Sequence, residues 1–122
     1  MEFSKLIPNI FYENIQDGLH LFVDCLEFTI GYDNLQSDCP SCIAEKGSLA
    51  VFLIQDKEFA DKDRPELRLQ THQIDQVFAK IEKTHPHLLH PNLNKVTLRD
   101  WGAKEFALRD TSGVCIIIQQ WN

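Results

Sequence analysis

The sequence predicts an α+β fold made of two βαβββ modules in a single domain. A strand-like segment, a helical apolar face and three further strand-like segments occur twice along the 122 residues. Placing Gln73 on Asn14, an offset of 59 residues, aligns the apolar positions of the two helical segments. A charged stretch separates the two copies. A repeat of about half the chain is typical of an internal duplication, in which neither copy buries its apolar face alone.

The first module is predicted to span residues 1–57. Residues 6–12 form a short apolar-rich strand, and Asn14 is well placed to cap the helix that follows, because its side-chain oxygen can accept a free backbone N–H of the first turn. One face of that helix carries Ile15, Leu19, Phe22, Val23 and Leu26. Three strands are expected at 28–32, 42–44 and 49–54, the last two joined in a hairpin at Gly47.

The second module is predicted to span residues 64–122, after a solvated linker at 58–63. The stretch 56–65 favours a linker because it is rich in Asp, Lys and Glu. A strand at 67–71 precedes a helix whose apolar face is Ile74, Val77, Phe78 and Ile81. Three strands are expected within 88–99, at 105–109 and at 114–120. The two modules should pack together and leave a concave surface for a small ligand on the side away from the helices.

Composition and charge exclude several classes of partner. Twelve Lys and Arg face 18 Asp and Glu, a formal net charge of −6, which disfavours nucleic acid. No apolar run approaches the roughly 20 residues that a membrane span needs, and the first residues lack the features of a secretory signal. We therefore expect a cytoplasmic protein without a membrane partner. Its cysteines are then expected to be reduced: Cys25, Cys39, Cys42 and Cys115.

Three stretches resemble one known superfamily, the glyoxalase, bleomycin-resistance and extradiol-dioxygenase (vicinal oxygen chelate) proteins. Residues 6–33, LIPNIFYENIQDGLHLFVDCLEFTIGYD, resemble the opening strand and helix of bleomycin-resistance-like members. Residues 66–81, ELRLQTHQIDQVFAKI, resemble the start of the second module. Residues 101–120, WGAKEFALRDTSGVCIIIQQ, resemble the closing hairpin. In the closing hairpin, Thr111 stands where the family usually has Pro, and Val114 stands where it often has Asn. Both replacements still allow the turn of that hairpin. The resemblance implies the glyoxalase/bleomycin resistance fold, with two modules forming a curled mixed sheet.

The resemblance also allows a test for the metal centre of the metal-dependent members. Their ligands lie on the first, fourth, fifth and eighth strands. Here Ile7, Glu66 and Ile117 occupy three of those positions, and the strand at 49–54 offers no ligating side chain. One carboxylate cannot hold a divalent cation. We therefore expect no metal, no cofactor and no catalytic residues, because the enzymes of this superfamily use the ion as a Lewis acid.

A metal-free member resembling bleomycin-resistance proteins would bind an aromatic or cationic small molecule, usually as a homodimer. Apolar walls, aromatic rings and a few polar groups suit such a ligand. Trp101 is the strongest candidate, because it lies in a polar turn at 100–102. The full candidate set is Asn9, Phe11, Phe52, Glu66, Arg68, Trp101 and Glu105. In a structural interpretation, Phe11 and Phe52 belong to the core, and Glu66 and Arg68 pair with each other or face water.

Other functions stay open. The alternative is a glyoxalase-like lyase or dioxygenase whose metal ligands lie elsewhere, for example at His72 or Glu105, since a one-residue slip reverses the face of a strand. A purely structural module is a third class. Cys39 and Cys42 form a C-x-x-C motif, but a hairpin follows it, and zinc would need two more ligands, for which the histidines of THPHLLHP (84–91) are the only dense source. That histidine segment is interpreted as a solvated loop.

Overall fold

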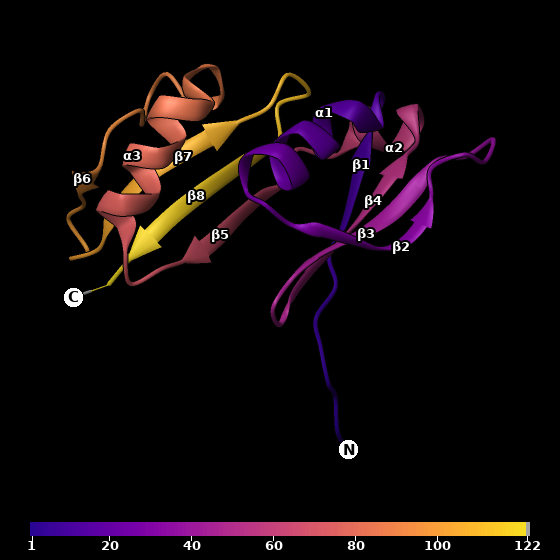
Figure 1. Cartoon of the computed structure of the whole chain (residues 1–122), viewed down its shortest axis with the longest axis horizontal. Coiled ribbons are helices and arrows are strands. Elements are labelled where there is room, and N and C mark those ends of the chain that lie inside the picture. Colours follow the sequence, from indigo (N-terminus) through magenta and orange to yellow (C-terminus); the bar gives the residue numbers. More distant parts are fainter. Residues whose placement is uncertain (122) are drawn as a thin grey trace. The chain divides into compact units, whose positions relative to one another are not determined.

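The chain forms two compact units, Met1–Asp63 and Arg64–Asn122, each with one four-stranded mixed sheet (Figure 1). The structure is a computed structural model that describes residues 1–121. Each unit contains strand, helix and three strands in that order, so the predicted α+β class with two βαβββ modules is confirmed. Within residues 1–121, no helix combines the length and the apolar content of a bilayer span.

The first unit has the sheet order β1-β4-β3-β2, with β1 parallel to β4 and the other pairs antiparallel. Its elements are β1 (Asn9–Tyr12), α1 (Ile15–Leu19) continuing into the π-helical turn η1 (His20–Cys25), β2 (Thr29–Asn34), β3 (Ser41–Lys46), β4 (Leu49–Gln55) and α2 (Lys57–Lys62). Helix α1 lies against β1 and β4. Ile10, Tyr12 and Leu53 are fully buried. The predicted cap is confirmed, because the Asn14 side chain accepts the Gln16 N–H at 3.0 Å.

The predicted linker is wrong in its local structure. Residues 57–62 form helix α2, and the Asp56 side chain caps it by accepting the Phe59 N–H at 3.1 Å. The Phe59 ring stacks on Phe11 of β1, with ring centroids 5.0 Å apart. The cap and this ring contact both stabilise the short helix. The prediction failed because it weighed the low apolar content of the segment and not the position of its single ring.

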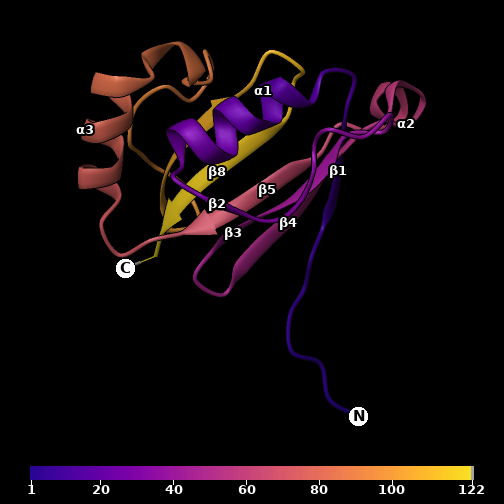
Figure 2. The ribbon, with the colours of Figure 1, turned by 45° about the vertical axis from the view of Figure 1, so that its right-hand side comes forward.

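The second unit repeats the arrangement with the sheet order β5-β8-β7-β6. Its elements are β5 (Glu66–Gln70), α3 (Ile74–Thr84), the 3-10 turn η2 (Pro86–Leu88), β6 (Thr97–Leu98), β7 (Lys104–Arg109) and β8 (Cys115–Gln120). Strands β5 and β8 run side by side and parallel (Figure 2). Helix α3 packs on β7 and β8, where Phe78 meets Phe106 edge to face at 5.1 Å.

The duplication extends to how the two helices begin. Helices α1 and α3 start at Ile15 and Ile74, which confirms the offset of 59. In each unit the last residue of the last strand supports the first residue of the helix: Gln55 Oε1 accepts the Ile15 N–H at 3.0 Å, and Gln120 Oε1 accepts the Ile74 N–H at 2.8 Å. These contacts satisfy one of the free N–H groups at each helix start. The sequence analysis did not find them, because the partners are distant along the chain.

Strand β1 is shorter than predicted, whereas β6 lies within the predicted range 88–99. Strand β1 begins at Asn9 and not at residue 6, since Pro8 has no N–H to donate and contributes only its carbonyl, which accepts the Phe52 N–H at 2.8 Å. Strand β6 has only two residues. The preceding segment joins β7 through a single bridge between Leu89 and Leu108 and through the His90 N–H, which donates to the Ala107 carbonyl at 2.8 Å.

Candidate functional site

The face of the second sheet that points away from α3 carries most of the polar candidate residues. Residues in register across neighbouring strands share a face, so this open face consists of three rows. The first row is Glu66, Cys115 and Arg109; the second is Arg68, Ile117 and Ala107; the third is Gln70, Gln119, Glu105 and Thr97. The middle row is apolar apart from Arg68, whose guanidinium reaches the third row, and its Ile117 and Ala107 are buried. Polar groups therefore gather at its two ends.

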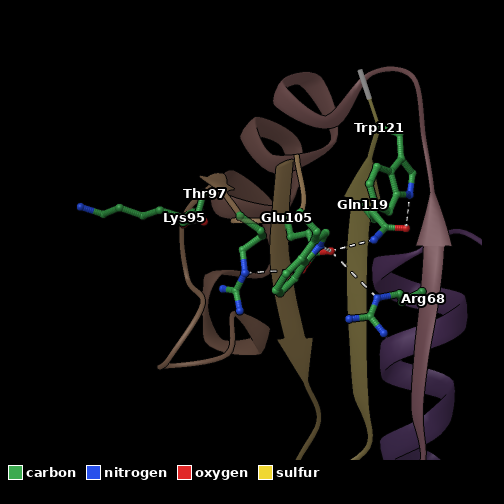
Figure 3. Close-up of polar contacts among 8 residues, drawn as sticks. Arg68, Lys95, Thr97, Glu105, Gln119 and Trp121 are labelled. Atoms are coloured by element: carbon green, nitrogen blue, oxygen red, sulfur yellow. Dashed lines mark hydrogen bonds and ion pairs between the residues drawn. The ribbon is translucent and has the colours of Figure 1, made fainter. Parts of the chain in front are cut away.

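At the end of the open face formed by the third row, the polar groups surround the buried carboxylate of Glu105. Glu105 of β7 is only 1% exposed, and its Oε2 accepts hydrogen bonds from Gln119 Nε2 at 2.7 Å and from Trp101 Nε1 at 3.1 Å. The guanidinium of Arg68 lies 4.0 Å from Oε2, and that of Arg99 lies 3.8 Å from Oε1. Figure 3 shows Arg68 of β5 and Gln119 of β8 directed at Glu105. We call Arg68, Arg99, Trp101, Glu105, Gln119 and Trp121 the Glu105 cluster.

The two tryptophans of the cluster each donate a hydrogen bond from the indole nitrogen and are about half exposed. Trp101 lies in the predicted turn, is 48% exposed, and has the Arg99 guanidinium 4.9 Å from its ring centroid. Trp121 Nε1 donates to Gln119 Oε1 at 2.9 Å, so Gln119 links the second indole to Glu105 (Figure 3). An exposed ring that cannot rotate freely offers a preformed surface for stacking.

The charge of the cluster does not favour a cation. The single carboxylate of Glu105 faces two guanidinium groups and already accepts two N–H groups. An incoming cation would have to displace these partners from a buried carboxylate, which is costly. Arg68 pairs with Glu105 and not with Glu66, which the sequence suggested as its partner.

The remaining candidates lie elsewhere. Asn9 and Phe52 are neighbours in register on the open face of the first sheet, and Tyr32 of β2 lies 6.0 Å from the Phe52 ring. Phe11 is half-buried and partly covered by Phe59. Glu66 lies at the opposite end of the second sheet from Glu105 and lines a hollow there. The structure thus joins Arg68, Trp101 and Glu105 in one cluster within the second unit and leaves Glu66 outside it.

The donor set does not fit the metal of the metal-dependent relatives. Ile7 lies outside β1, and Ile117 forms part of the apolar middle of the open face. Glu105 is surrounded by guanidinium and N–H donors, which would repel a cation. Across residues 1–121, His, Cys, Asp and Glu side chains form no group of three or more that could hold an ion. No metal-assisted step can therefore be derived from these residues.

The four cysteines are free thiols, and burial of three of them opposes ionisation. Burial, aided by Glu27 and Asp24, raises the pKa of Cys25 to about 11. Burial also raises the pKa of Cys42, with a contribution from Asp33. Cys39 is exposed and precedes β3, whereas Cys42 lies within that strand. A strand after the C-x-x-C motif does not offer the helix N-terminus that activates a redox thiol.

The histidine segment is more ordered than a solvated loop. Leu88 is buried, and the His90 N–H pairs with β7. The His85 and His87 rings lie 5.8 Å apart. Two intervening leucines bring the segment against the second sheet, a contact that the prediction underestimated.

Comparison with known proteins supports the fold. No protein-family model matches the sequence, and no curated protein matches it. Among solved structures, a bleomycin-binding protein complexed with bleomycin is 16% identical, with a TM-score of 0.74, covering 98% of this chain and 100% of that one. TioX from Micromonospora sp. ML1 is 11% identical, with a TM-score of 0.79 and coverage of 98% and 99%. A glyoxalase family protein from Enterococcus faecalis is 17% identical, with a TM-score of 0.70 and coverage of 97% and 96%.

The chain therefore has the fold of the glyoxalase/bleomycin resistance superfamily, as its sequence resemblance predicted. At these identities the likeness concerns the fold. The side chains of the Glu105 cluster must be interpreted from this chain itself. Sequence analysis missed three of them, namely Arg99, Gln119 and Trp121. Alternation in the closing hairpin could have placed Gln119 beside Glu105, but it could not show which side chains reach the carboxylate.

Proposed function

We propose that this chain is a metal-free small-molecule binding protein that holds a planar aromatic ligand against Trp101 on the open face of the second sheet. The observation that carries the proposal is the exposed Trp101 ring, fixed by a hydrogen bond to the buried Glu105 and flanked by Arg99. Such a ring adds stacking energy of about 0.5–1.5 kcal/mol beyond burial. The bleomycin-binding protein with this fold binds a small molecule, which supports the same class of ligand here.

The ligand we propose is aromatic rather than cationic. The sequence resemblance implied an aromatic or cationic ligand, since two carboxylates and one Arg among the candidates would tolerate a positive charge. Glu105 instead meets two guanidinium groups, so this part of the face suits a neutral or electron-rich ring. Phe52 and Tyr32 form a separate aromatic pair on the open face of the first sheet.

Tryptophan fluorescence tests the proposal. Trp121→Phe leaves Trp101 as the reporter, and Trp101→Phe is the matched control, since the sequence has two tryptophans. Bleomycin and a panel of smaller aromatic compounds are titrated into both variants. We expect saturable quenching in Trp121→Phe and none in Trp101→Phe. If no compound perturbs Trp101, or if added divalent metal produces turnover of a hemithioacetal, the proposal fails and the lyase or dioxygenase alternative gains support.

We also propose a cytoplasmic homodimer. The free thiols agree with a reducing compartment. Phe3 and Leu6 are 86% and 85% exposed, which leaves apolar side chains that a second copy could cover. Sedimentation velocity should show a dimer that weakens when both residues are changed to Ser; a monomer at all concentrations would contradict this part of the proposal.

A further inference from the structure

The second unit contains a hollow that the proposed aromatic site does not use. Its volume is about 670 Å³, within the usual range for small-molecule sites. It lies at the first-row end of the second sheet, where β7 turns into β8, and is lined by the start of β5, the turn at 111–113 and the segment 87–91. All of its lining residues belong to the second unit.

Two arginines bring hydrogen-bond donors to the lining of the hollow. Arg64 and Arg109 both line the hollow, and in the part of the chain that the structure describes neither guanidinium makes a salt bridge. His90 Nδ1 accepts the Asn92 N–H at 3.1 Å, which leaves the proton of the neutral ring on Nε2. The hydroxyls of Thr111 and Ser112 also line the hollow.

The two carboxylates of the hollow equal its two arginines in number, so its preference for an anion depends on where the carboxylates lie. Asp110 is buried, and its Oδ1 accepts the Val114 N–H at 3.0 Å, so its carboxylate is engaged in the turn. Glu66 is the other carboxylate, in register with Cys115 on the neighbouring strand. Arg109 is in register with Cys115 on the opposite side, so β8 lies between Glu66 and Arg109. The backbones of Glu66 and Arg109 are thus separated by two strand spacings, roughly 10 Å.

We propose that this hollow binds a small organic oxyanion, a phosphate ester or a carboxylate. Two guanidinium forks match the planar or tetrahedral oxygens of such groups and can bind them through paired hydrogen bonds. Leu88 and Leu89 supply apolar lining for the organic body. The volume exceeds what a bare anion fills. A metal is not the ligand, since the hollow's own His, Cys, Asp and Glu side chains form no group of three that could hold one.

The test is a titration of the full chain, at low ionic strength, with inorganic phosphate, glycerol 3-phosphate and propionate. Backbone amide shifts of Gly113 and His90 in two-dimensional NMR report on the hollow. We expect saturable shifts there, weakened by added salt, with an organic anion binding more tightly than inorganic phosphate. The tighter of glycerol 3-phosphate and propionate identifies the headgroup.

Two variants and one control decide the assignment. Arg64→Gln and Arg109→Gln should each weaken binding by about tenfold or more, the usual worth of a charge-assisted hydrogen bond. Lys95→Gln removes the same charge from an exposed position outside the hollow, and its side chain extends away from the Glu105 cluster in Figure 3. It should bind as the wild type does. Unsaturable shifts, or equal weakening in all three variants, would overturn the site. The NMR titration does not depend on Trp101 fluorescence, so either proposal can be refuted without refuting the other.

Discussion

Replacing Glu105 with Gln tests whether the buried carboxylate holds the Glu105 cluster together. The substitution keeps the size of the side chain but removes its charge. It leaves one carbonyl oxygen to accept from both Gln119 and Trp101, while the new NH₂ group faces the arginines. Hydrogen bonds to a charged group contribute about 1.5–3 kcal/mol each, whereas those to a neutral group contribute about half as much.

The expected loss of stability in Glu105→Gln depends on how exposed the partners of Glu105 are. The Arg68 and Arg99 side chains are 49% and 34% exposed, at 4.0 and 3.8 Å, so both can turn toward water, and their ion pairs contribute at most about 1 kcal/mol together. The two hydrogen bonds dominate. We expect Glu105→Gln to lower the free energy of unfolding by about 2–3 kcal/mol, and Glu105→Ala by about 3–4 kcal/mol because it also leaves a cavity.

Urea unfolding followed by far-UV circular dichroism measures this change. The midpoint should fall while the slope with urea stays constant, since the same surface is exposed on unfolding. Trp101 emission should also shift, because its nitrogen loses a charged partner. Arg68→Gln is the matched control, with an expected loss below about 1 kcal/mol. A Glu105→Gln protein as stable as the wild type would refute the claim that the carboxylate organises the cluster.

Three further predictions concern the rest of the fold. Gly18→Ala should destabilise by about 1–3 kcal/mol in urea unfolding, because a Cβ there would lie 2.5 Å from the Tyr12 ring; unchanged stability would show that the ring moves freely. Gln120→Ala should cost about 1 kcal/mol by removing the acceptor for the Ile74 N–H, whereas Gln120→Glu, which keeps an acceptor, should not. Cys25, with its pKa raised to about 11, stays a thiol at pH 8 and should be the slowest cysteine to react with iodoacetamide in peptide mapping; early labelling would contradict its burial.

Local patterns predicted most of the secondary structure. Apolar spacing located α1 and α3, and Asn14 identified the start of α1, because periodicity and capping depend on neighbours along the chain. The same reasoning missed α2. The aromatic contact from Phe59 to Phe11 joins residues far apart in sequence, and a local count of apolar residues cannot detect it.

The candidate site was predicted in part. Trp101 and Glu105 were both chosen from the sequence, and the structure connects them by a hydrogen bond. Alternation predicted that Glu66 and Arg68 share one face, and the register agrees. Alternation did not predict that Glu66 and Arg68 contribute to polar groups at opposite ends of the sheet. Arg68 reaches across β8 to Glu105 of β7, whereas Glu66 lines the hollow at the other end of the sheet.

The sequence by itself determined the doubled module, its helices and the faces of its strands, since these follow from periodicity and local capping. Only the tertiary structure decided the chemistry of the open face. It placed Arg68, Arg99 and Gln119 around the carboxylate of Glu105, and it brought Arg64 and Arg109 to one hollow. These neighbours come from different strands and connecting segments. The strength of an electrostatic contact depends on distance and burial, which no spacing along a chain specifies.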